Sequence, residues 1–172
     1  MSTSIDLPMD KLVYPPEAYD RNLTLKPPFL LIAVMVYCDI PLLFILLAYN
    51  PSPKLQAAFV PLQHYATPLS FVSGLPAAVV IAAWTKRLPT SGDGWRQIWG
   101  WGKWLLSFSL VSHFILLFSQ LHGTLWNSYA LTDKDRFLMV QMGLALLALY
   151  YLWRVRRVSD VFADFPARPK ED

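Results

Sequence analysis

Two ionisable residues stand well inside apolar stretches of the sequence. Asp39 lies near the middle of the run at residues 29–49, and His113 near the middle of the run at residues 104–122. If both runs cross a membrane, this carboxylate and this imidazole lie at a similar depth, where they can pair or exchange a proton. Asp39 and His113 are therefore a candidate intramembrane polar pair. They could act as a proton relay or ion-linked switch or as a clasp between two helices, or Asp39 could contact a partner subunit.

The runs that carry these residues belong to a set of four. The 172-residue chain is 55% hydrophobic and 16% charged, whereas a soluble domain carries about 25% charged residues. The apolar runs cover residues 29–49, 68–85, 104–122 and 136–154, and about 20 apolar residues cross a bilayer. They are apolar on all sides, which favours helices over the alternating strands of a barrel. We expect an all-α, four-transmembrane-helix bundle within a membrane domain at residues 29–165.

The segments around the four runs have their own patterns. Residues 1–28 are polar and rich in proline, so we expect an extended cytoplasmic segment. Residues 94–103 could form a short helix along the membrane surface or a plain loop with anchoring aromatic residues. The tail after Trp153 has apolar residues at helical spacing, so the fourth helix could continue beyond the membrane or turn onto its surface. Thr132 and Asp135 resemble a capping box before the fourth run. Residues 166–172 are expected to be disordered.

The basic residues predict an orientation. Of the 15 Lys and Arg residues, 12 lie in the N-terminal segment, the second loop and the C-terminal tail, and three lie in the other two loops. Because basic residues concentrate on the cytoplasmic side of membrane proteins, both termini are predicted to be cytoplasmic. Indole rings favour the headgroup region, and most tryptophans fall near this side. The expected interfacial anchors are Trp84, Trp95, Trp99, Trp101, Trp104 and Trp153.

Three short motifs resemble a known family. They are Tyr19-Asp20 followed by Leu25-Lys26-Pro27-Pro28, then Gly74-Leu75-Pro76-Ala77, and finally the segment Ser159-Asp160-Val161-Phe162-Ala163-Asp164-Phe165-Pro166. Together they resemble the YfeZ-like inner-membrane proteins of proteobacteria, a family of unknown function (DUF2919), from about Tyr14 to Pro166. The resemblance implies location in a bacterial inner membrane. It supplies no activity and no catalytic residues.

The remaining motifs do not predict an enzyme. His64, His113 and His122 are widely spaced and Cys38 is the single cysteine, so no metal or cofactor site is predicted. A net charge of +3 is too small to suggest nucleic acid. We expect a non-catalytic accessory or assembly subunit whose partners are the lipid bilayer and a partner membrane subunit or a second copy of the chain.

Two other functions stay open at this point. The first is an oligomeric, proton-coupled transporter component that uses Asp39 and His113. The second is a membrane enzyme that acts on lipid, with His64 or His122 at the outer face.

Overall fold

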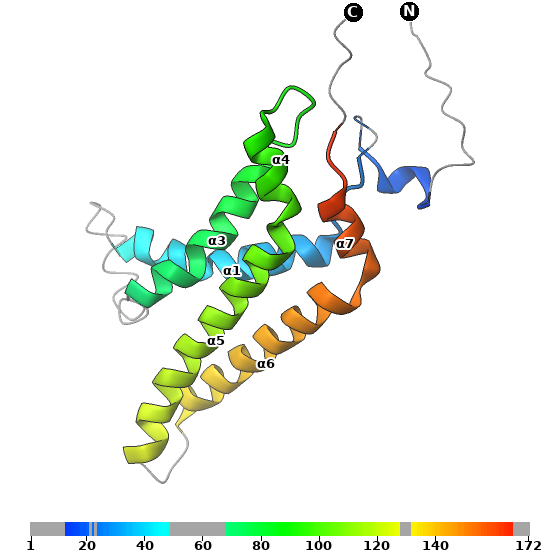
Figure 1. Cartoon of the computed structure of the whole chain (residues 1–172). Coiled ribbons are helices and arrows are strands. Elements are labelled where there is room, and N and C mark those ends of the chain that lie inside the picture. The colour runs from blue at the N-terminus through cyan, green and yellow to red at the C-terminus, as the bar shows by residue number, and fades with distance from the viewer. Residues whose placement is uncertain (1–12, 21, 23, 49–67, 128–131, 167–172) are drawn as a thin grey trace, which may run out of the picture.

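The computed structural model describes residues 13–20, 22, 24–48, 68–127 and 132–166 (Figure 1). Its described part is all-α, as predicted. The helices are α1 (Phe29–Ala48), α3 (Pro68–Thr85), α4 (Asp93–Gly100), α5 (Gly102–Asn127), α6 (Asp133–Arg154) and α7 (Arg156–Ala163), preceded by a 3-10 turn at Pro16–Ala18. The long helices α1, α3, α5 and α6 correspond to the four apolar runs. The expected disordered tail, apart from Pro166, lies outside the described residues.

Local sequence signals account for where helices begin and end. The Thr132 hydroxyl accepts a hydrogen bond from the Asp135 amide at 3.3 Å, and an Asp135 carboxylate oxygen accepts one from the Thr132 amide at 2.9 Å. The predicted capping box at the start of α6 is therefore confirmed. At the other end of α6, the extended backbone of Val155 separates it from α7.

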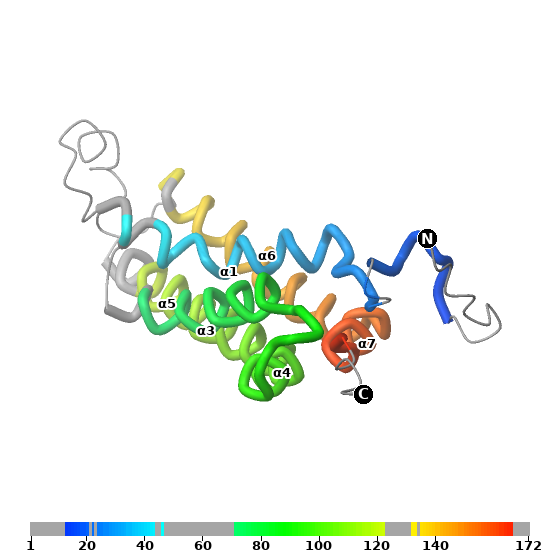
Figure 2. The backbone as a smooth tube through the Cα atoms, turned by 90° about the horizontal axis from the view of Figure 1, so that it is seen from above, coloured from blue at the N-terminus to red at the C-terminus, as the bar shows by residue number. Residues whose placement is uncertain are grey.

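The long helices pack in the order α1, α3, α5, α6, and α1 crosses α3 and α5 obliquely (Figures 1 and 2). Small residues on α3 permit the close approach of α1. A Cβ atom on Gly74 would lie 2.7 Å from the Cβ atom of Leu42. Between α1 and α6 lies an apolar cavity of about 330 Å³. A hydrogen bond from the Tyr37 hydroxyl to the Gln141 carbonyl links these two helices.

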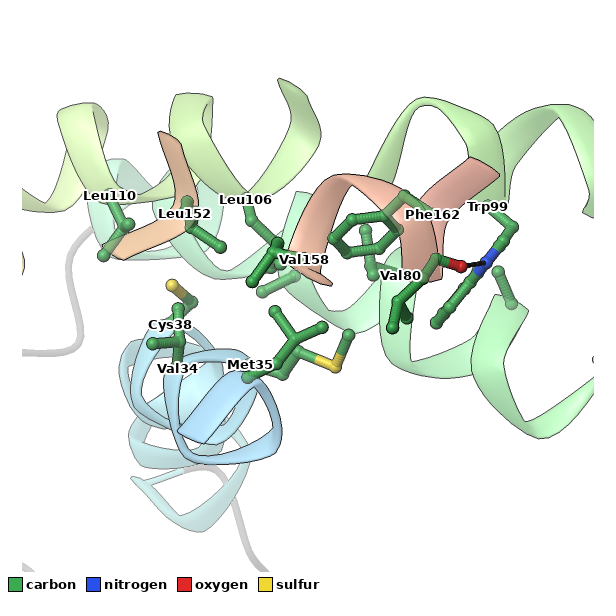
Figure 3. Close-up of a cluster of buried hydrophobic side chains, with 14 of the residues drawn as sticks. Val34, Met35, Cys38, Val80, Trp99, Leu106, Leu110, Leu152, Val158 and Phe162 are labelled. Carbon is green, nitrogen blue, oxygen red and sulfur yellow. Dashed lines mark hydrogen bonds between the residues drawn. The ribbon is translucent and has the colours of Figure 1, made fainter. Parts of the chain in front are cut away.

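One buried cluster joins the long helices to the short ones. Figure 3 shows Met35 and Cys38 from α1 beside Leu106 and Leu110 from α5, with Trp99 and Phe162 at the far end. Both short helices are amphipathic, as expected, and they bury their apolar faces against this cluster and against each other. The cluster therefore extends beyond the long helices into α4 and α7.

The six tryptophans predicted as interfacial anchors differ in their exposure. Trp101, Trp104 and Trp153 are exposed, as interfacial anchors would be, and Trp84 and Trp95 are half-buried. Trp99 is fully buried. Its indole N–H donates to the Val161 carbonyl at 2.9 Å, so it joins α4 to α7. The expectation for Trp99 is corrected: it packs in the core and does not reach the surface.

Two helical stretches of the described residues are long and apolar enough to cross a membrane, by length and composition. They are Gly102–His122 in α5 and Asp135–Arg154 in α6. The stretches Phe29–Leu43 in α1 and Phe71–Thr85 in α3 are apolar but shorter.

Candidate functional site

The candidate pair, Asp39 and His113, is not joined in the structure. Within the described residues no hydrogen bond or ion pair links the two side chains. Asp39 is half-buried and His113 is buried. The Oδ1 atom of Asp39 and the Nδ1 atom of His113 each lack a hydrogen-bond partner there. The two residues lie on neighbouring elements but do not form one site.

Helix geometry explains this separation. Consecutive residues in an α-helix are rotated by about 100°, so Tyr37 and Asp39 point to nearly opposite flanks of α1. Tyr37 takes the flank that faces α5. Its ring meets the His113 ring edge-on, with the centroids 5.4 Å apart. Asp39 is directed to the other flank.

The other sequence candidates add no reactive centre. His122 is exposed, with its ring 6.2 Å from that of Phe118, and His64 lies outside the described residues. Cys38 is a buried free thiol. In the part of the chain that the structure describes, no three His, Cys, Asp or Glu residues are grouped as metal ligands would be.

A denser set of polar contacts lies at the end of the bundle where α1 begins and α3 ends. We call it the polar cap and define it by Asp20, Leu25, Arg87, Trp99 and Asp164. At its centre the Arg87 guanidinium donates to the Leu25 carbonyl at 2.8 Å and to the Asp164 carbonyl at 2.7 Å. It also lies 3.6 Å from the Asp164 carboxylate and 5.0 Å from the Trp99 ring centroid.

The Arg87 side chain is 4% exposed. Burial lowers the pKa of its guanidinium, and the carboxylates of Asp164 and Asp20 act in the opposite direction. An arginine side chain remains charged in proteins in spite of such shifts. A buried charge with several partners fixes its neighbours, because the loss of one partner would leave it unsatisfied.

The N-terminal segment is held in place by this cap. The Leu25 amide donates to the Asp164 carboxylate at 2.6 Å. Asp20 accepts hydrogen bonds from the amide and hydroxyl of Thr24 and from the Asn22 amide. The described part of residues 1–28 is thus a folded loop rather than the extended segment that we expected, because carboxylates satisfy its backbone donors.

A second contact joins the two ends of the described chain. The Tyr14 hydroxyl donates to the Asp160 carboxylate at 2.6 Å, and the Arg157 guanidinium lies over the Tyr14 ring. This hydrogen bond raises the pKa of the Tyr14 phenol. The N-terminal loop is therefore bound at two points, by Tyr14 to α7 and by Leu25 to the residue that follows α7.

Sequence analysis did not select Arg87, Asp160 or Asp164 as site residues. Arg87 was counted only as one of the basic residues that predict the orientation of the chain. A signal was present, because Asp160 and Asp164 are two carboxylates four residues apart that closely follow the three arginines at positions 154, 156 and 157. The contacts of the cap hold the N-terminal loop against α4 and against the residue that follows α7.

Comparison with known proteins gives a match to one family model. No curated protein and no solved structure shows significant similarity to the chain. The family described as "Protein of unknown function (DUF2919)" matches residues 14–164. The first and last matched residues are Tyr14, which bonds Asp160, and Asp164, which bonds Leu25. Because the match covers most of the 172 residues, the chain belongs to the DUF2919 family.

Proposed function

We propose that the chain is a four-span protein of the bacterial inner membrane, with both termini cytoplasmic, and that it acts as a non-catalytic accessory or assembly subunit. The observation that carries the proposal is an apolar belt on the outer faces of all four long helices. Large exposed hydrophobic side chains include Phe29, Val36, Leu43, Leu46, Phe71, Val72, Leu75, Phe108, Val111, Ile115, Phe118, Val140, Leu144, Leu147 and Tyr150.

An apolar surface of this extent is foreign to soluble monomers, whose apolar patches seldom exceed a few hundred Å². In a bilayer the same side chains face lipid. Apart from Asp39, the charged residues of the four helices lie in their first or last turns. That distribution matches a protein whose middle is in hydrocarbon and whose ends are in water.

The lengths of the two remaining helices support four spans rather than two. At 1.5 Å per residue, the 20 residues of α1 and the 18 residues of α3 would be about 30 and 27 Å long. A hydrocarbon core is about 30 Å thick, and a slightly short helix is accommodated by local thinning. Proline within α1 and α3 is compatible with spans because it is common in transmembrane helices.

The surroundings of Asp39 support the proposal that the chain is a subunit of a larger assembly. Val36, Leu43 and Leu46 share a face of α1 with it, at spacings of three, four and seven residues, and all three are exposed. A carboxylate in the middle of a lipid-facing stripe is costly, and intramembrane charges are usually paired. We expect Asp39 to meet a polar side chain of a partner subunit or of a second copy of the chain.

Cysteine labelling tests the topology. We expect Ser91→Cys, in the loop between α3 and α4, to react with a membrane-impermeant maleimide only in inverted vesicles. Asp133→Cys, at the start of α6, should react only from the outside of intact spheroplasts. The native Cys38 is fully buried and serves as the internal unreactive control. Labelling of both positions from one side would refute four spans with this orientation.

Crosslinking and co-purification test the subunit role. Asp39→Leu should leave the monomer inserted, because Asp39 forms no hydrogen bond or ion pair with another side chain of the described residues, but should abolish recovery of the larger complex. Leu43→Ala, on the same face, is the control that changes shape without removing the carboxylate. Recovery of the wild type only as a free monomer would reject the subunit role.

A second candidate is a proton-coupled component of an oligomeric transporter. It is favoured by the unsatisfied polar atoms of Asp39 and His113 within the proposed spans. In that case Asp39→Asn should abolish proton or solute flux in proteoliposomes while the protein remains folded. Unchanged flux in this variant would remove the candidate.

A further inference from the structure

A cleft of about 270 Å³ lies where α4, the first turn of α5 and α7 meet. Arg96, Lys103 and Ser159 contribute its polar lining, and Trp104 and Phe165 are its aromatic walls. None of its lining residues is an aspartate or a glutamate. Two cations without a lining carboxylate make the cleft selective for an anion.

Both cations are held in position by contacts within the protein. The Lys103 ammonium donates to the Ser159 hydroxyl at 2.9 Å and lies 4.2 Å from the Trp153 ring centroid. The Arg96 guanidinium donates to the Pro166 carbonyl at 2.9 Å and lies 4.8 Å from the Phe165 ring centroid. Each cation keeps N–H donors beyond these bonds, since an ammonium has three and a guanidinium five.

An apolar track begins at the same cleft. Trp104 lines the cleft and is exposed. Exposed side chains follow it along α5 at positions four, seven, eleven and fourteen residues further on, which places them on one face. They are Phe108, Val111, Ile115 and Phe118. The track leads from the cleft toward the proposed hydrocarbon core.

We propose that the cleft binds the phosphate headgroup of an anionic phospholipid, whose acyl chains lie along the α5 track. The headgroup chemistry is recognised by Arg96 and Lys103, and the Ser159 hydroxyl adds a neutral donor. The site rests on the proposed membrane location, since it requires this end of the bundle to lie at headgroup depth. A free phosphate would satisfy the cations but would leave the apolar track unused.

Thermal unfolding of the full chain in neutral detergent tests the site. Added dioleoylphosphatidylglycerol should raise the midpoint by about 3 °C more than dioleoylphosphatidylcholine, the size expected for ligand at about ten times its dissociation constant. The double variant Arg96→Gln with Lys103→Gln should lose this difference. The control double variant Arg154→Gln with Arg156→Gln removes the same charge from exposed residues at the same end. It should retain the difference between the two lipids.

If the double variant Arg96→Gln with Lys103→Gln does not fold, a variant that changes the shape of the cleft still tests the site. A Cβ atom on Gly100, which lines the cleft, meets no atom within 4 Å. The position therefore has room for a Cβ atom, and we expect the larger side chain of Gly100→Leu to obstruct the cleft and to abolish the effect of phosphatidylglycerol.

Three outcomes would overturn the proposal: equal stabilisation by both lipids, equal losses in the two double variants, or a full effect of sodium phosphate alone, which would indicate a free-phosphate site. If the cysteine labelling supports four spans and any of these results is obtained, the lipid site is rejected and the proposed membrane topology is not.

Discussion

At the scale of single residues, Arg87 joins three segments that are distant in sequence. It bonds Leu25 of the N-terminal loop and Asp164 after α7, and it lies against Trp99 of α4. Lysine could not replace it, because a single ammonium lacks the flat, forked set of donors that reaches two carbonyls while stacking on a ring.

Arg87→Gln should lower the free energy of unfolding by about 1.5–3 kcal/mol, the range for hydrogen bonds of charged groups. Unfolding in detergent, followed by tryptophan fluorescence, measures the change. The neighbouring Lys86→Gln provides the control, since Lys86 is exposed and its loss should change stability little. Similar losses in the two variants would mean that charge at this end matters and the Arg87 contacts do not.

Asp20 makes a pH-dependent contribution to the same cap. Burial acts to raise the pKa of its carboxyl, but the hydrogen bonds from Thr24 and Asn22 outweigh this effect, so the pKa lies below its ordinary value of 3.8. A depressed pKa in the folded state stabilises the protein above the unfolded-state pKa. The stabilisation disappears as the pH falls through the folded-state value.

Asp20→Asn should therefore destabilise the loop at pH 7. Its difference from the wild type should begin to shrink as the pH falls below about 3.8 and should disappear once the pH is below the folded-state pKa. Hydrogen exchange of residues 18–28 as a function of pH would measure this. A difference between the two proteins that persists unchanged at pH 3 would contradict the role of the ionised carboxylate.

At the scale of elements, the close contact of α1 with α3 depends on the small side chains of α3. Ser73, Gly74 and Ala77 are buried on α3, and the Ser109 hydroxyl of α5 donates to the Ser73 carbonyl. Small residues let helix backbones approach closely in membranes, where packing drives association. The motif Gly74-Leu75-Pro76-Ala77 is thus a packing motif.

Gly74→Ala should lower the thermal unfolding midpoint in detergent, because the new methyl group overlaps Leu42 and overpacking costs about 1–3 kcal/mol. Gly143→Ala is the matched control. A Cβ atom there meets nothing within 4 Å, and alanine favours the helix by about 1 kcal/mol. Equal responses at the two positions would show that propensity, and not contact with α1, governs α3.

At the scale of the whole molecule, the N-terminal loop and the segment around α7 close one end of the bundle. The loop is bound by Asp160 and Asp164, which lie 146 and 139 residues after their partners Tyr14 and Leu25. The cap can therefore form only after α6 and α7 are complete. This closure joins the segments that precede α1, follow α3 and follow α7 at one end of the bundle.

Truncation after Arg154 should expose the loop. Without α7 and Asp164, we expect amide exchange in residues 18–28 to rise about tenfold or more, while α5 remains protected. Hydrogen exchange with mass spectrometry measures both regions. Truncation after Pro166 preserves every contact described for the cap and should leave exchange as in the wild type. Unchanged protection in the shorter chain would mean that the loop is held by its own turn alone.

Much of this fold was predictable because its causes are local. Apolar runs and the Thr132–Asp135 box define where helices occur, and those signals act within a few residues. The candidate pair was not predictable in the same way. Asp39 and His113 were predicted to pair because they lie at similar positions within two apolar runs. Depth in a membrane, however, does not specify how each helix is rotated about its axis.

The sequence by itself determined the class of the protein: four long apolar helices, two short amphipathic ones and an uneven distribution of basic residues. Only the tertiary structure decided which side chains meet. It turned Tyr37 instead of Asp39 toward His113, buried Trp99, and gathered Leu25, Arg87 and Asp164 into one cap. Helix formation follows from the composition of each segment, whereas these contacts depend on how separate helices rotate and pack, which no single segment encodes.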